Sequence, residues 1–509
     1  MSPFSSESVT GSARPTRAVV LAGGGGLRAN PAAKVVNKCL FSIHDHSLVE
    51  RQINLIRDQL GITDIIIVVG HLRQQVMDYL GDGSRWGVAV RYVEVERVEE
   101  GPARGLLAAK AYLDRPFFLL LGDEFHNTSR HDRLLEYLDR RPDALFTYIH
   151  TIDPYRIMSN FTLGIDESDG VEWIKEKPRK VESDLCGCGT MYLTPRAVEA
   201  IENAKPSETT GRVELYEAVA SLIPDGKVFA VDVDDPGYFN VNTLEDLQRA
   251  RFTYRTRKFD EFSISVVIPA WNEAQSIEYV IQDFKARPKI GEIIVTDNLS
   301  EDGTGEIAKK AGARVLARRY VGYGDAVKAG LDAATGDILV VVEADYSFRA
   351  ADLPKILVYL RDADAVIGTR TTREFVAQSA NMSVLQRVAN VALAKYLELL
   401  WIWLEPRFTD VGCSYRAIWR TEWESLRDQV VEKGPSFTVE MMIEVVKARK
   451  RCIEIPVSYH PRFGGESKHT QDMVGLVKTG SAMAWMITSR WLQDVGRLLS
   501  HWVRGERSR

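Results

Sequence analysis

The sequence predicts two consecutive α/β domains, each with a mostly parallel central sheet, followed by amphipathic helices at the C-terminus. Both halves open in the same way, because Ala18–Leu21 and Ile264–Ile268 are apolar strands that run into turns rich in Gly, Pro or Asn. Alternating strand and helix patterns follow each of these strands, and this alternation is typical of parallel sheets with crossover helices. The length of 509 residues also exceeds what one ordinary hydrophobic core accommodates.

The later elements divide the chain into segments. The expected later strands are Asp64–Val69, Val88–Val93, Phe117–Leu121, Glu292–Val295, Ala313–Ala317 and Ile338–Val342. A helix over Leu244–Arg251 closes the first half, and the charged stretch Thr253–Glu261 marks the boundary. Because that stretch contains no Pro or Gly, we expect a stiff joint. The predicted segments are a disordered leader over 1–16, domains over 17–255 and 262–470, and C-terminal helices over 471–509.

Composition excludes several classes of protein. A net charge of -5 provides no basic surface for nucleic acid. Five scattered cysteines do not form a disulfide framework, which favours a reducing compartment, and Cys186 and Cys188 fit a buried strand better than a metal site. The Ser- and Pro-rich start has no apolar signal segment, and no stretch approaches the ~18 apolar residues of a membrane span. We therefore expect a cytoplasmic protein.

The first half carries a glycine-rich turn followed by two cations. Gly23–Gly26 come directly after the first strand, Arg28 follows, and Lys38 stands ten positions later. Glycine permits tight turns and lets backbone N–H groups approach phosphate oxygens. Arginine adds a fork of donors suited to phosphate. The spacing of these residues therefore indicates a phosphate-binding loop more strongly than glycines alone.

On these residues the first half, from about Arg17 to Phe252, resembles the sugar-1-phosphate nucleotidyltransferases. The further segments that match this family, in chain order, are Gly101–Lys110, Leu119–Glu124, Ile174–Pro178, Cys188–Leu193 and Phe239–Leu247. The chain departs from the family at Leu27, Asn37 and Pro102, where Thr, Pro and Thr are usual, and Arg104 adds a charge beside the expected base pocket. These departures leave the reaction type in place and the identity of the nucleotide open.

The resemblance implies three groups of site residues in the first half. The nucleotide and its phosphates would be held by Gly23, Gly24, Gly25, Gly26, Gly101, Arg28 and Lys38. Mg²⁺ would be bound by Asp123 with Asn242 or Asn240, and the sugar phosphate by Glu176, Lys177 and Gly189. Nucleotidyl transfer brings two anions together, so cations are needed to screen them. Because magnesium keeps several waters, one carboxylate and one amide can suffice.

The second half ends an apolar strand on two carboxylates, Glu343 and Asp345. Asp297 ends another apolar strand, and Pro269–Glu273 follows the first one. Ligands gather at the carboxyl ends of strands in open α/β sheets. Two carboxylates at positions i and i+2 there suit a divalent cation that bridges a diphosphate.

From about Ile264 to His469 the second half resembles glycosyltransferase family 2, especially the branch of dolichol-phosphate mannose synthase and its bacterial relatives. Besides the residues above, the matching segments are Gly368–Arg370, Thr409–Arg420, Phe437–Met442, Glu454–Tyr459 and Arg462–His469. Glu343 stands where Asp is commoner, which should still bind a metal. The two resemblances imply nucleotide-binding, Rossmann-like domains of the GT-A type, and the second implies inversion of the sugar's anomeric centre.

The second resemblance also implies site residues. The nucleotide would be bound by Pro269, Glu273, Asp297 and Lys328, and a metal, Mg²⁺ or alternatively Mn²⁺, by Glu343 and Asp345. Phosphate would be bound by Arg370, Arg462 and Lys468. Asp410 and Glu440 are candidates for positioning the acceptor or for acting as general base, and Glu440 is equally the charge at a helix N-terminus.

Two Trp-containing segments, Val384–Leu404 and Met473–Val503, are apolar but too charged to span a bilayer. They fit helices that rest on a membrane surface, or helices that pack on each other or form a dimer interface. The lipid-phosphate branch of the family favours the membrane surface, on the inner face.

These observations predict a bifunctional enzyme. A nucleoside triphosphate and a sugar 1-phosphate would give a nucleotide sugar and pyrophosphate, and the second domain would transfer the sugar to an acceptor such as a polyprenyl phosphate. Two alternatives remain at this point: a nucleotidyltransferase for a non-sugar phosphate, and a protein in which one domain senses a nucleotide sugar to regulate the other.

Overall fold

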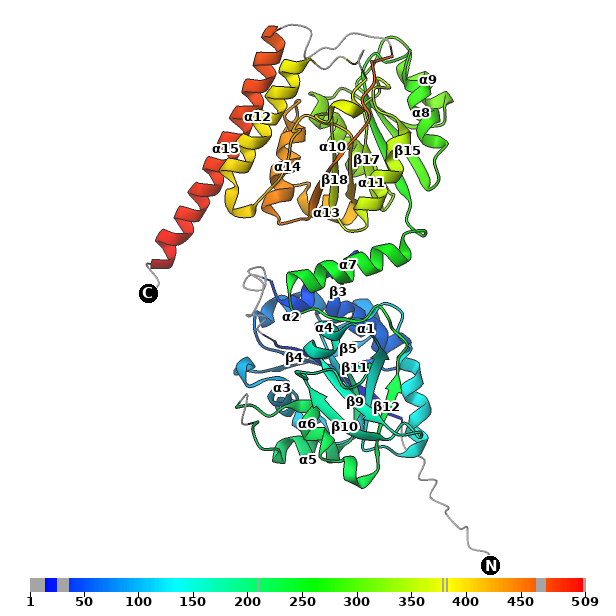
Figure 1. Ribbon diagram of the computed structural model, residues 1–509, viewed down its shortest axis with the longest axis vertical. Helices are drawn as coiled ribbons and strands as arrows, with labels where there is room; N and C mark the ends of the chain where they lie inside the picture. The colour runs from blue at the N-terminus through cyan, green and yellow to red at the C-terminus, as the bar shows by residue number, and fades with distance from the viewer. Residues whose placement is uncertain are drawn as a thin grey trace, which may run out of the picture. The chain divides into compact units, whose positions relative to one another are not determined.

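A computed structural model describes residues 14–24, 36–207, 211–377, 380, 383–463 and 473–506. The chain divides into two compact units, Met1–Tyr254 and Arg255–Arg509, each with its own sheet (Figure 1). Of the expected leader only residues 14–16 belong to the described part. Each unit is an α/β domain, which confirms the predicted fold class, and each sheet combines parallel with antiparallel pairs.

The first unit contains a nine-stranded sheet. Its strands are β1 (Arg17–Ala22), β4 (Asp64–Val69), β5 (Ala89–Glu94), β6 (Phe117–Leu121), β8 (Ala144–His150), β9 (Phe161–Ile165), β10 (Val171–Glu176), β11 (Leu185–Leu193) and β12 (Val228–Asp232). The order is β10-β9-β11-β6-β1-β4-β5, with β8 joining β11 to β12. The β6-β1-β4-β5 part is parallel, so the carboxyl ends of these strands meet at one edge.

The other elements of this unit are short. The helices are α1 (Leu48–Asp58), α2 (Arg73–Leu80), α3 (Pro102–Ala108), α4 (Pro154–Ser159), α5 (Pro195–Asn203) and α6 (Leu215–Ala220). The 3-10 turns are η2 (Lys38–Leu40), η3 (Ser84–Trp86), η4 (Val98–Glu100), η5 (Lys110–Tyr112), η6 (His131–Arg140) and η7 (Ile223–Asp225). Two small sheets pair β2 (Ser42–Ile43) with β3 (His46–Ser47), and β7 (Glu124–Phe125) with β13 (Phe239–Asn240).

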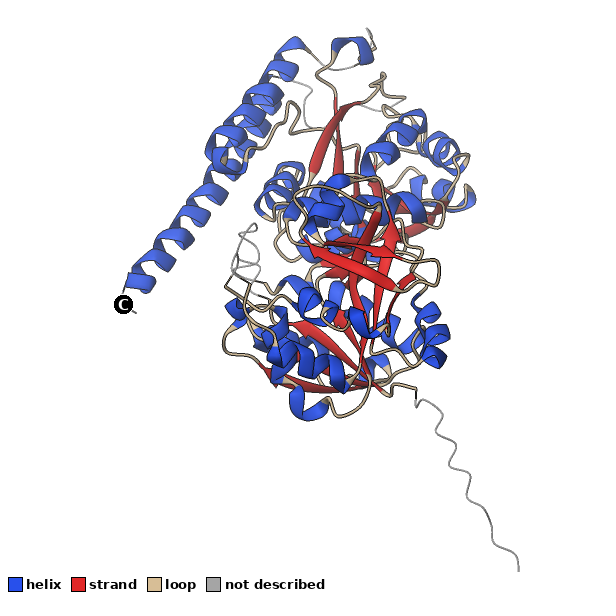
Figure 2. Cartoon of the chain, turned by 60° about the horizontal axis from the view of Figure 1, so that its bottom comes forward, coloured by secondary structure: helices blue, strands red, loops and turns tan. Residues whose placement is uncertain are grey.

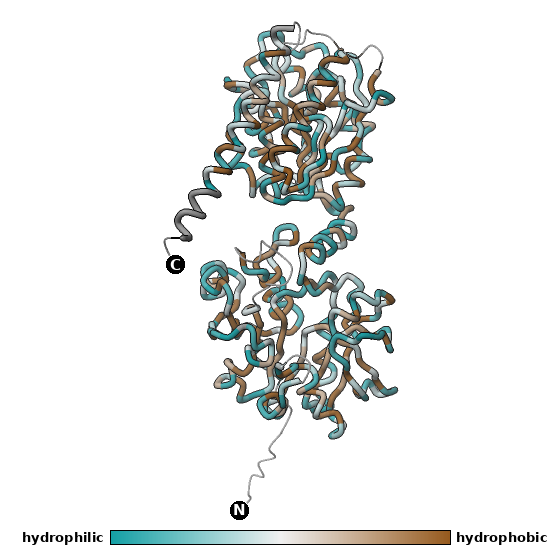
Figure 3. The backbone as a smooth tube through the Cα atoms, turned by 60° about the vertical axis from the view of Figure 1, so that its left-hand side comes forward, coloured by the Kyte–Doolittle hydropathy of each residue, from teal (hydrophilic) through white to brown (hydrophobic). Residues whose placement is uncertain are grey.

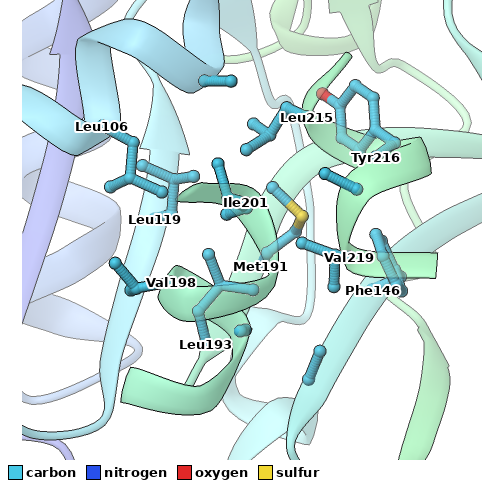
Figure 4. Packing of buried hydrophobic residues seen from close by; sticks show 14 of the residues in the cluster. Leu106, Leu119, Phe146, Met191, Leu193, Val198, Ile201, Leu215, Tyr216 and Val219 are labelled. Atoms are coloured by element: carbon cyan, nitrogen blue, oxygen red, sulfur yellow. The ribbon is translucent and has the colours of Figure 1, made fainter. Parts of the chain in front are cut away.

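Apolar side chains pack on both faces of this sheet because neighbouring residues of a strand point to opposite sides. Val19 joins one buried cluster and Val20 the other, and both are fully buried. Figure 4 shows the first cluster, in which Met191 packs with Ile201 of α5 and Val219 of α6. Each such side chain contributes about 1.5–3 kcal/mol when fully buried.

Helix α7 (Leu244–Lys258) contains the boundary between the two units. The sequence prediction ended this helix at Arg251, but the charged stretch that follows has no Pro or Gly to stop it. The helix therefore continues to Lys258. Acidic residues occupy its first turn and basic residues its last turn, which suits the helix dipole at both ends.

The second unit contains a seven-stranded sheet of order β16-β15-β14-β17-β19-β18-β20. Its strands are β14 (Ile264–Ala270), β15 (Ile290–Asp297), β16 (Arg314–Ala317), β17 (Ile338–Val341), β18 (Ala365–Thr369), β19 (Arg416–Trp419) and β20 (Cys452–Pro456). Only the pairs that include β19 are antiparallel among these strands. In this unit the hydrophobic segments concentrate towards the interior (Figure 3).

The helices of the second unit are α8 (Ile277–Lys285), α9 (Thr304–Lys310), α10 (Tyr323–Ala333), α11 (Leu353–Leu360), α12 (Val384–Leu400), α13 (Arg420–Leu426), α14 (Phe437–Lys447) and α15 (Met473–Glu506), with 3-10 turns η8 (Ala350–Asp352), η9 (Arg373–Phe375) and η10 (Ile402–Leu404). Of these helices, α8, α9, α10, α11 and α13 pack on the strands, whereas α12 and α15 pack on each other.

The two Trp-containing segments form helices that lie side by side, α12 with η10 and α15 (Figures 1 and 2). The hydroxyls of Tyr396 and Thr488 are 2.9 Å apart, and Trp401 donates its indole N–H to Asp494 at 3.2 Å. The sequence predicted several C-terminal helices, whereas the described part of that region is one helix of 34 residues. No helix in the described ranges has the length and apolar composition needed to cross a membrane.

Candidate functional sites

The first site lies where the parallel strands β1 and β6 end. Gly23 and Gly24 follow β1, and Asp123 follows β6. Lys38 begins η2, and Asn37 caps that turn by accepting a hydrogen bond from the Cys39 N–H at 2.9 Å. The Asn37 amide also donates to the carbonyls of Ala22 and His71. Asn37, which departs from the family pattern, therefore ties the Lys38 turn to the end of β1.

Lys38, Asp123 and Asn242 come together although they are far apart in the sequence. Lys38 Nζ forms an ion pair with Asp123 Oδ2 and lies 3.4 Å from Asn242 Oδ1. The pairing of β13 with β7 causes this approach, because the residue after β13 donates its N–H to the Asp123 carbonyl at 2.9 Å. Asn240 accepts a hydrogen bond from the Asn242 amide at 3.0 Å.

The electrostatic balance at Lys38 follows from its surroundings. Burial by itself would lower the pKa of this ammonium group, but the Asp123 carboxylate outweighs burial and leaves the pKa raised. Lys38 therefore stays a cation where it pairs with the Asp123 side chain. One carboxylate with two amide oxygens nearby fits the hard-oxygen preference of Mg²⁺.

Asn160 connects this group to the expected sugar-phosphate residues. Its side-chain oxygen accepts from the Asn240 amide at 3.2 Å, and its carbonyl accepts from the Lys177 N–H at 2.7 Å. Glu176 lies 3.3 Å from Lys177 Nζ. Burial raises the pKa of Glu176 to about 7, against the lowering effect of Lys177. Nothing in the sequence singled out Asn160, because its contacts come from strands distant along the chain.

Gly189 and Glu124 form another part of this site. Glu124 is buried and accepts hydrogen bonds from the Gly189 N–H at 2.8 Å and from the Tyr238 hydroxyl. A Cβ atom on Gly189 would come within 2.5 Å of Leu121 and 2.7 Å of Glu124, so only glycine fits. Glu124 was part of a segment matched to the family, but the sequence assigned it no role.

The glycine loop is described only in part. A Cβ atom on Gly24 would lie 3.4 Å from the Lys38 side chain, so the loop passes close to that cation. Gly101 has a φ of 91° and caps α3, a conformation that favours glycine. Gly25, Gly26 and Arg28 lie outside the described residues.

The second site is a cavity of about 590 Å³ at the carboxyl edge of β14, β15 and β17. Parallel pairing aligns Ala270 with Asp297 and places the turn after β17 beside them. The predicted residues that line this cavity are Pro269, Glu273, Glu343, Asp345, Arg370 and Arg462. The structure therefore brings six of the predicted site residues together in one cavity.

The two carboxylates after β17 have different partners. Glu343 accepts a hydrogen bond from the Ser414 hydroxyl at 2.8 Å, and Arg462 Nε lies 3.3 Å from Asp345. Arg462 also reaches Glu273 at 3.0 Å. Burial, followed by the neighbouring Asp345 charge, raises the pKa of Glu343 to about 7. Crowded, buried carboxylates of this kind suit a divalent cation, which would relieve their repulsion.

Arg370 and Asp410 form a bidentate ion pair with distances of 2.8 and 2.9 Å. Asp410 is fully buried, and although burial would raise its pKa, Arg370 holds that pKa below its usual range. Glu454 fixes the same loop by accepting from the backbone N–H groups of Thr409 and Asp410. A buried carboxylate whose pKa is lowered by an ion pair is a poor general base, so this geometry favours a positioning role.

Glu440 is also fully buried, in the first turn of α14. One carboxylate oxygen pairs with Arg490 of α15, and the other accepts the Glu432 N–H at 2.6 Å. Glu440 therefore lies at a helix N-terminus, which is one of the two roles that the sequence suggested. Its ion pair with Arg490 was not predicted.

The remaining candidates of the second half lie in different surroundings. Asp297 is nearly buried and accepts hydrogen bonds from both the N–H and the hydroxyl of Ser300. Lys328, expected at the nucleotide, instead lies over the Trp423 ring and donates to the carbonyl of Arg427. Lys468 lies outside the described residues.

Several residues of the cavity escaped the sequence prediction. Ser414 and Tyr459 belong to segments matched to the family, whereas Thr479 and Met483 come from α15, where no motif pointed to a site. Across the described ranges no three His, Cys, Asp or Glu side chains gather as a metal cluster. Each candidate metal site thus offers one or two carboxylates, which leaves room for water and phosphate oxygens.

Each unit matches the model of a known protein family. A model of the nucleotidyl transferase family matches residues 17–257, and a model of glycosyl transferase family 2 matches residues 265–412. An uncharacterized glycosyltransferase of Mycobacterium tuberculosis is 32% identical over 217 residues, which cover 42% of this chain and 93% of the relative.

Two further relatives carry more specific names. A glucose-1-phosphate thymidylyltransferase of Streptomyces antibioticus is 34% identical over 213 residues, which cover 41% of this chain and 58% of the relative. An undecaprenyl-phosphate mannosyltransferase of Micrococcus luteus is 29% identical over 238 residues, which cover 45% of this chain and 96% of the relative. The chain thus spans less than two thirds of the length of the thymidylyltransferase.

Proposed function

Because this chain belongs to glycosyl transferase family 2 and carries a nucleotidyl transferase domain ahead of that unit, we propose that it both makes and uses a nucleotide sugar. The first unit joins a sugar 1-phosphate to a nucleoside triphosphate and releases pyrophosphate. The second unit transfers the sugar, with inversion, from the nucleotide to an acceptor. Both families consist of transferases, so each unit is enzymatic in kind.

The observation that carries the first activity is the convergence of Lys38, Asp123 and Asn242, with Gly24 of the glycine loop close to Lys38. In nucleotidyl transfer the sugar phosphate oxygen attacks the α-phosphorus, and the bond to pyrophosphate breaks. Asp123 with Asn242 or Asn240 would hold Mg²⁺, which screens the phosphates. Lys38 then contacts phosphate oxygens, and Lys177 with Glu176 holds the sugar phosphate.

The second activity rests on the cavity that combines Glu343 and Asp345 with Arg370 and Arg462. The two carboxylates would hold Mg²⁺ or Mn²⁺, which supplies positive charge to the departing diphosphate. Arg370 and Arg462 would add positive charge that stabilises the departing diphosphate and binds the acceptor phosphate. A phosphate acceptor is already an anion and needs little base catalysis, which fits the buried, ion-paired state of Asp410 and Glu440.

The proposed acceptor is a polyprenyl phosphate at a membrane surface. A similar protein is named as an undecaprenyl-phosphate mannosyltransferase. A largely apolar groove of about 320 Å³ is lined by Thr371, which follows Arg370 in the sequence, and by Arg387, Val388, Val391 and Ala392 of α12. The exposed apolar residues of α12, η10 and α15 include Val384, Val388, Leu399, Ile402, Trp403, Val477, Trp485 and Leu492. Such helices bind the lipid interface without crossing it.

The decisive experiment measures both reactions on the purified full chain. Each nucleoside triphosphate is incubated with a panel of sugar 1-phosphates, beginning with thymidine triphosphate and glucose 1-phosphate because of the thymidylyltransferase relative. We expect magnesium-dependent release of pyrophosphate with at least one pair. The nucleotide sugar formed is then offered with polyprenyl phosphate, and lipid-linked sugar is measured. No pyrophosphate from any pair would contradict the first activity, and no sugar transfer would contradict the second.

A further inference from the structure

One wall of the cavity in the second unit comes from the C-terminal helix. Thr479 and Met483 of α15 line it together with residues from the sheet and its loops. The family model ends at residue 412, so this wall lies beyond the matched segment. Helix α15 is therefore a candidate part of the site and not only a surface helix.

The docked face of α15 follows the helical repeat. Thr479, Met483, Ile487, Arg490 and Asp494 are spaced by four, four, three and four residues, so they share one face. Met483 and Ile487 are buried in a cluster with residues of α12 and α14. On other faces of the helix, Trp485 is 70% exposed and Leu492 is 54% exposed.

Glu440 ties this helix to a second wall of the cavity. One oxygen of the buried carboxylate pairs with Arg490, and the other accepts the N–H of Glu432. Glu432 in turn accepts the Gly434 N–H at 2.8 Å, and Gly434 and Pro435 line the cavity. A single carboxylate thus connects α15 on one side with the 432–435 loop on the other.

Position in the fold indicates which part of the cavity α15 forms. Of the residues expected at the nucleotide, Pro269 and Asp297 lie at the carboxyl ends of β14 and β15, and α8 and α9 pack on β15. Helix α15 instead packs on α12 and α14, and it lies on the side of the unit opposite to α8 and α9 (Figures 1 and 2). The wall formed by Thr479 and Met483 is therefore at the end of the cavity away from the nucleotide edge.

We propose that α15 is an integral part of the glycosyltransferase site, where Thr479 and Met483 form the wall against which the acceptor lies and so determine which acceptor fits. Glu440 and Arg490 are positioning residues that hold this wall and the 432–435 loop in register. The proposal rests on the glycosyl transfer proposed above, and it replaces a proton-transfer role for Glu440 with a positioning role.

The first test fills the cavity from the helix side. Thr479→Val and Thr479→Phe add increasing apolar volume, and Leu492→Phe adds an aromatic ring at an exposed position of the same helix. We expect Thr479→Phe to lower kcat/KM for the acceptor at least about tenfold, Thr479→Val to lower it less, and Leu492→Phe to leave it unchanged. The KM for the nucleotide sugar and the release of pyrophosphate should stay at wild-type values in all three, with melting temperatures checking the fold.

The outcomes separate two failures. A wild-type chain that transfers sugar, with Thr479→Phe equal to it, would overturn the role of α15 and leave the proposed function intact. A wild-type chain without sugar transfer would overturn the proposed function, and this inference with it.

The second test separates positioning from proton transfer. Arg490→Met leaves the Glu440 charge buried without its partner, so we expect a strong loss of transfer, about tenfold or more. Glu440→Gln keeps an acceptor for the Glu432 N–H and should cost less. The double variant Glu440→Gln with Arg490→Met removes both charges and should recover activity relative to Arg490→Met alone. If Glu440→Gln and the double variant are equally inactive, Glu440 takes part in the chemistry and the positioning role is wrong.

Discussion

In both units a cation expected to bind phosphate rests on a carboxylate expected to bind the metal. Lys38 pairs with Asp123 in the first unit, and Arg462 contacts Asp345 in the second. The surroundings differ, because the first carboxylate is accompanied by neutral amides of Asn240 and Asn242, whereas the second has another carboxylate, Glu343, two residues before it.

This difference has a consequence for how each site uses a divalent cation. In the first unit the carboxylate is already neutralised by a lysine, so a metal must compete with Lys38 for Asp123. In the second unit burial, followed by the charge of the neighbouring Asp345, raises the pKa of Glu343, because two carboxylates lie close together there. We therefore expect the second site to depend more than the first on a bound divalent cation for its electrostatic balance.

The largest expected effect follows from that dependence. Asp345→Ala removes one of the two carboxylates and the contact to Arg462, so the rate of sugar transfer should fall below the detection limit. Pyrophosphate release should remain at the wild-type rate because each unit has its own carboxylates. Both rates are measured on the same folded variant. Loss of both activities in that variant would show that the two sites are not separable.

A smaller but still large effect is expected at Lys38. Lys38→Ala removes the phosphate-binding cation and should reduce the rate of pyrophosphate release about 100-fold, since such electrostatic contacts typically contribute a few kcal/mol to a transition state. Sugar transfer from added nucleotide sugar is the internal control and should not change. Pyrophosphate release at the wild-type rate would remove Lys38 from the site.

The pattern of success in the sequence prediction has a physical explanation. The strand–turn motifs predicted that Glu343, Asp345 and Pro269 lie at the carboxyl edge of one sheet, and the structure places them there. The prediction was possible because apolar strands are recognisable in the sequence and parallel strands bring their carboxyl ends together. Lys38 and Asp123 were predicted for one site from family spacing, and they form an ion pair.

What the sequence could not show are contacts that depend on tertiary packing. Asn160, Thr479 and Met483 carry no local motif, and each reaches its site only because distant elements pack together. The pairing of Glu440 with Arg490 joins residues fifty positions apart. Lys328 was expected at the nucleotide from its motif, yet the helix directs it to Trp423 and the Arg427 carbonyl.

A moderate effect of pH should distinguish the first site further. Burial raises the pKa of Glu176 to about 7, so the carboxylate gains a proton as the pH falls through 7. A protonated Glu176 cannot accept a hydrogen bond from a sugar hydroxyl in the same way, so KM for the sugar phosphate should rise up to about tenfold per pH unit below 7. Glu176→Gln should remove this dependence and retain only the titration of the phosphate itself, near pH 6. An identical pH profile in the variant would show that Glu176 does not contact the sugar.

The smallest expected effect concerns membrane binding, which we expect of the second unit and not of the first. Exposed apolar residues lie along α12 and α15 of the second unit, and the exposed Lys478 is on the same helix as Trp485. We expect the chain to float with anionic liposomes at low salt and to be released as salt rises. Trp485→Ala should weaken this binding, and Lys478→Ala should weaken it roughly fivefold, since a basic side chain near an anionic surface contributes about 1 kcal/mol.

The control is Ile152→Ala, which removes a side chain that is 99% exposed in the first unit and should not alter flotation. If Ile152→Ala reduces flotation as much as Trp485→Ala, binding does not depend on the α12 and α15 surface. If the wild-type chain does not float at all, the acceptor is not presented at a lipid surface, and the exposed faces of α12 and α15 must be explained as an interface between copies of the chain.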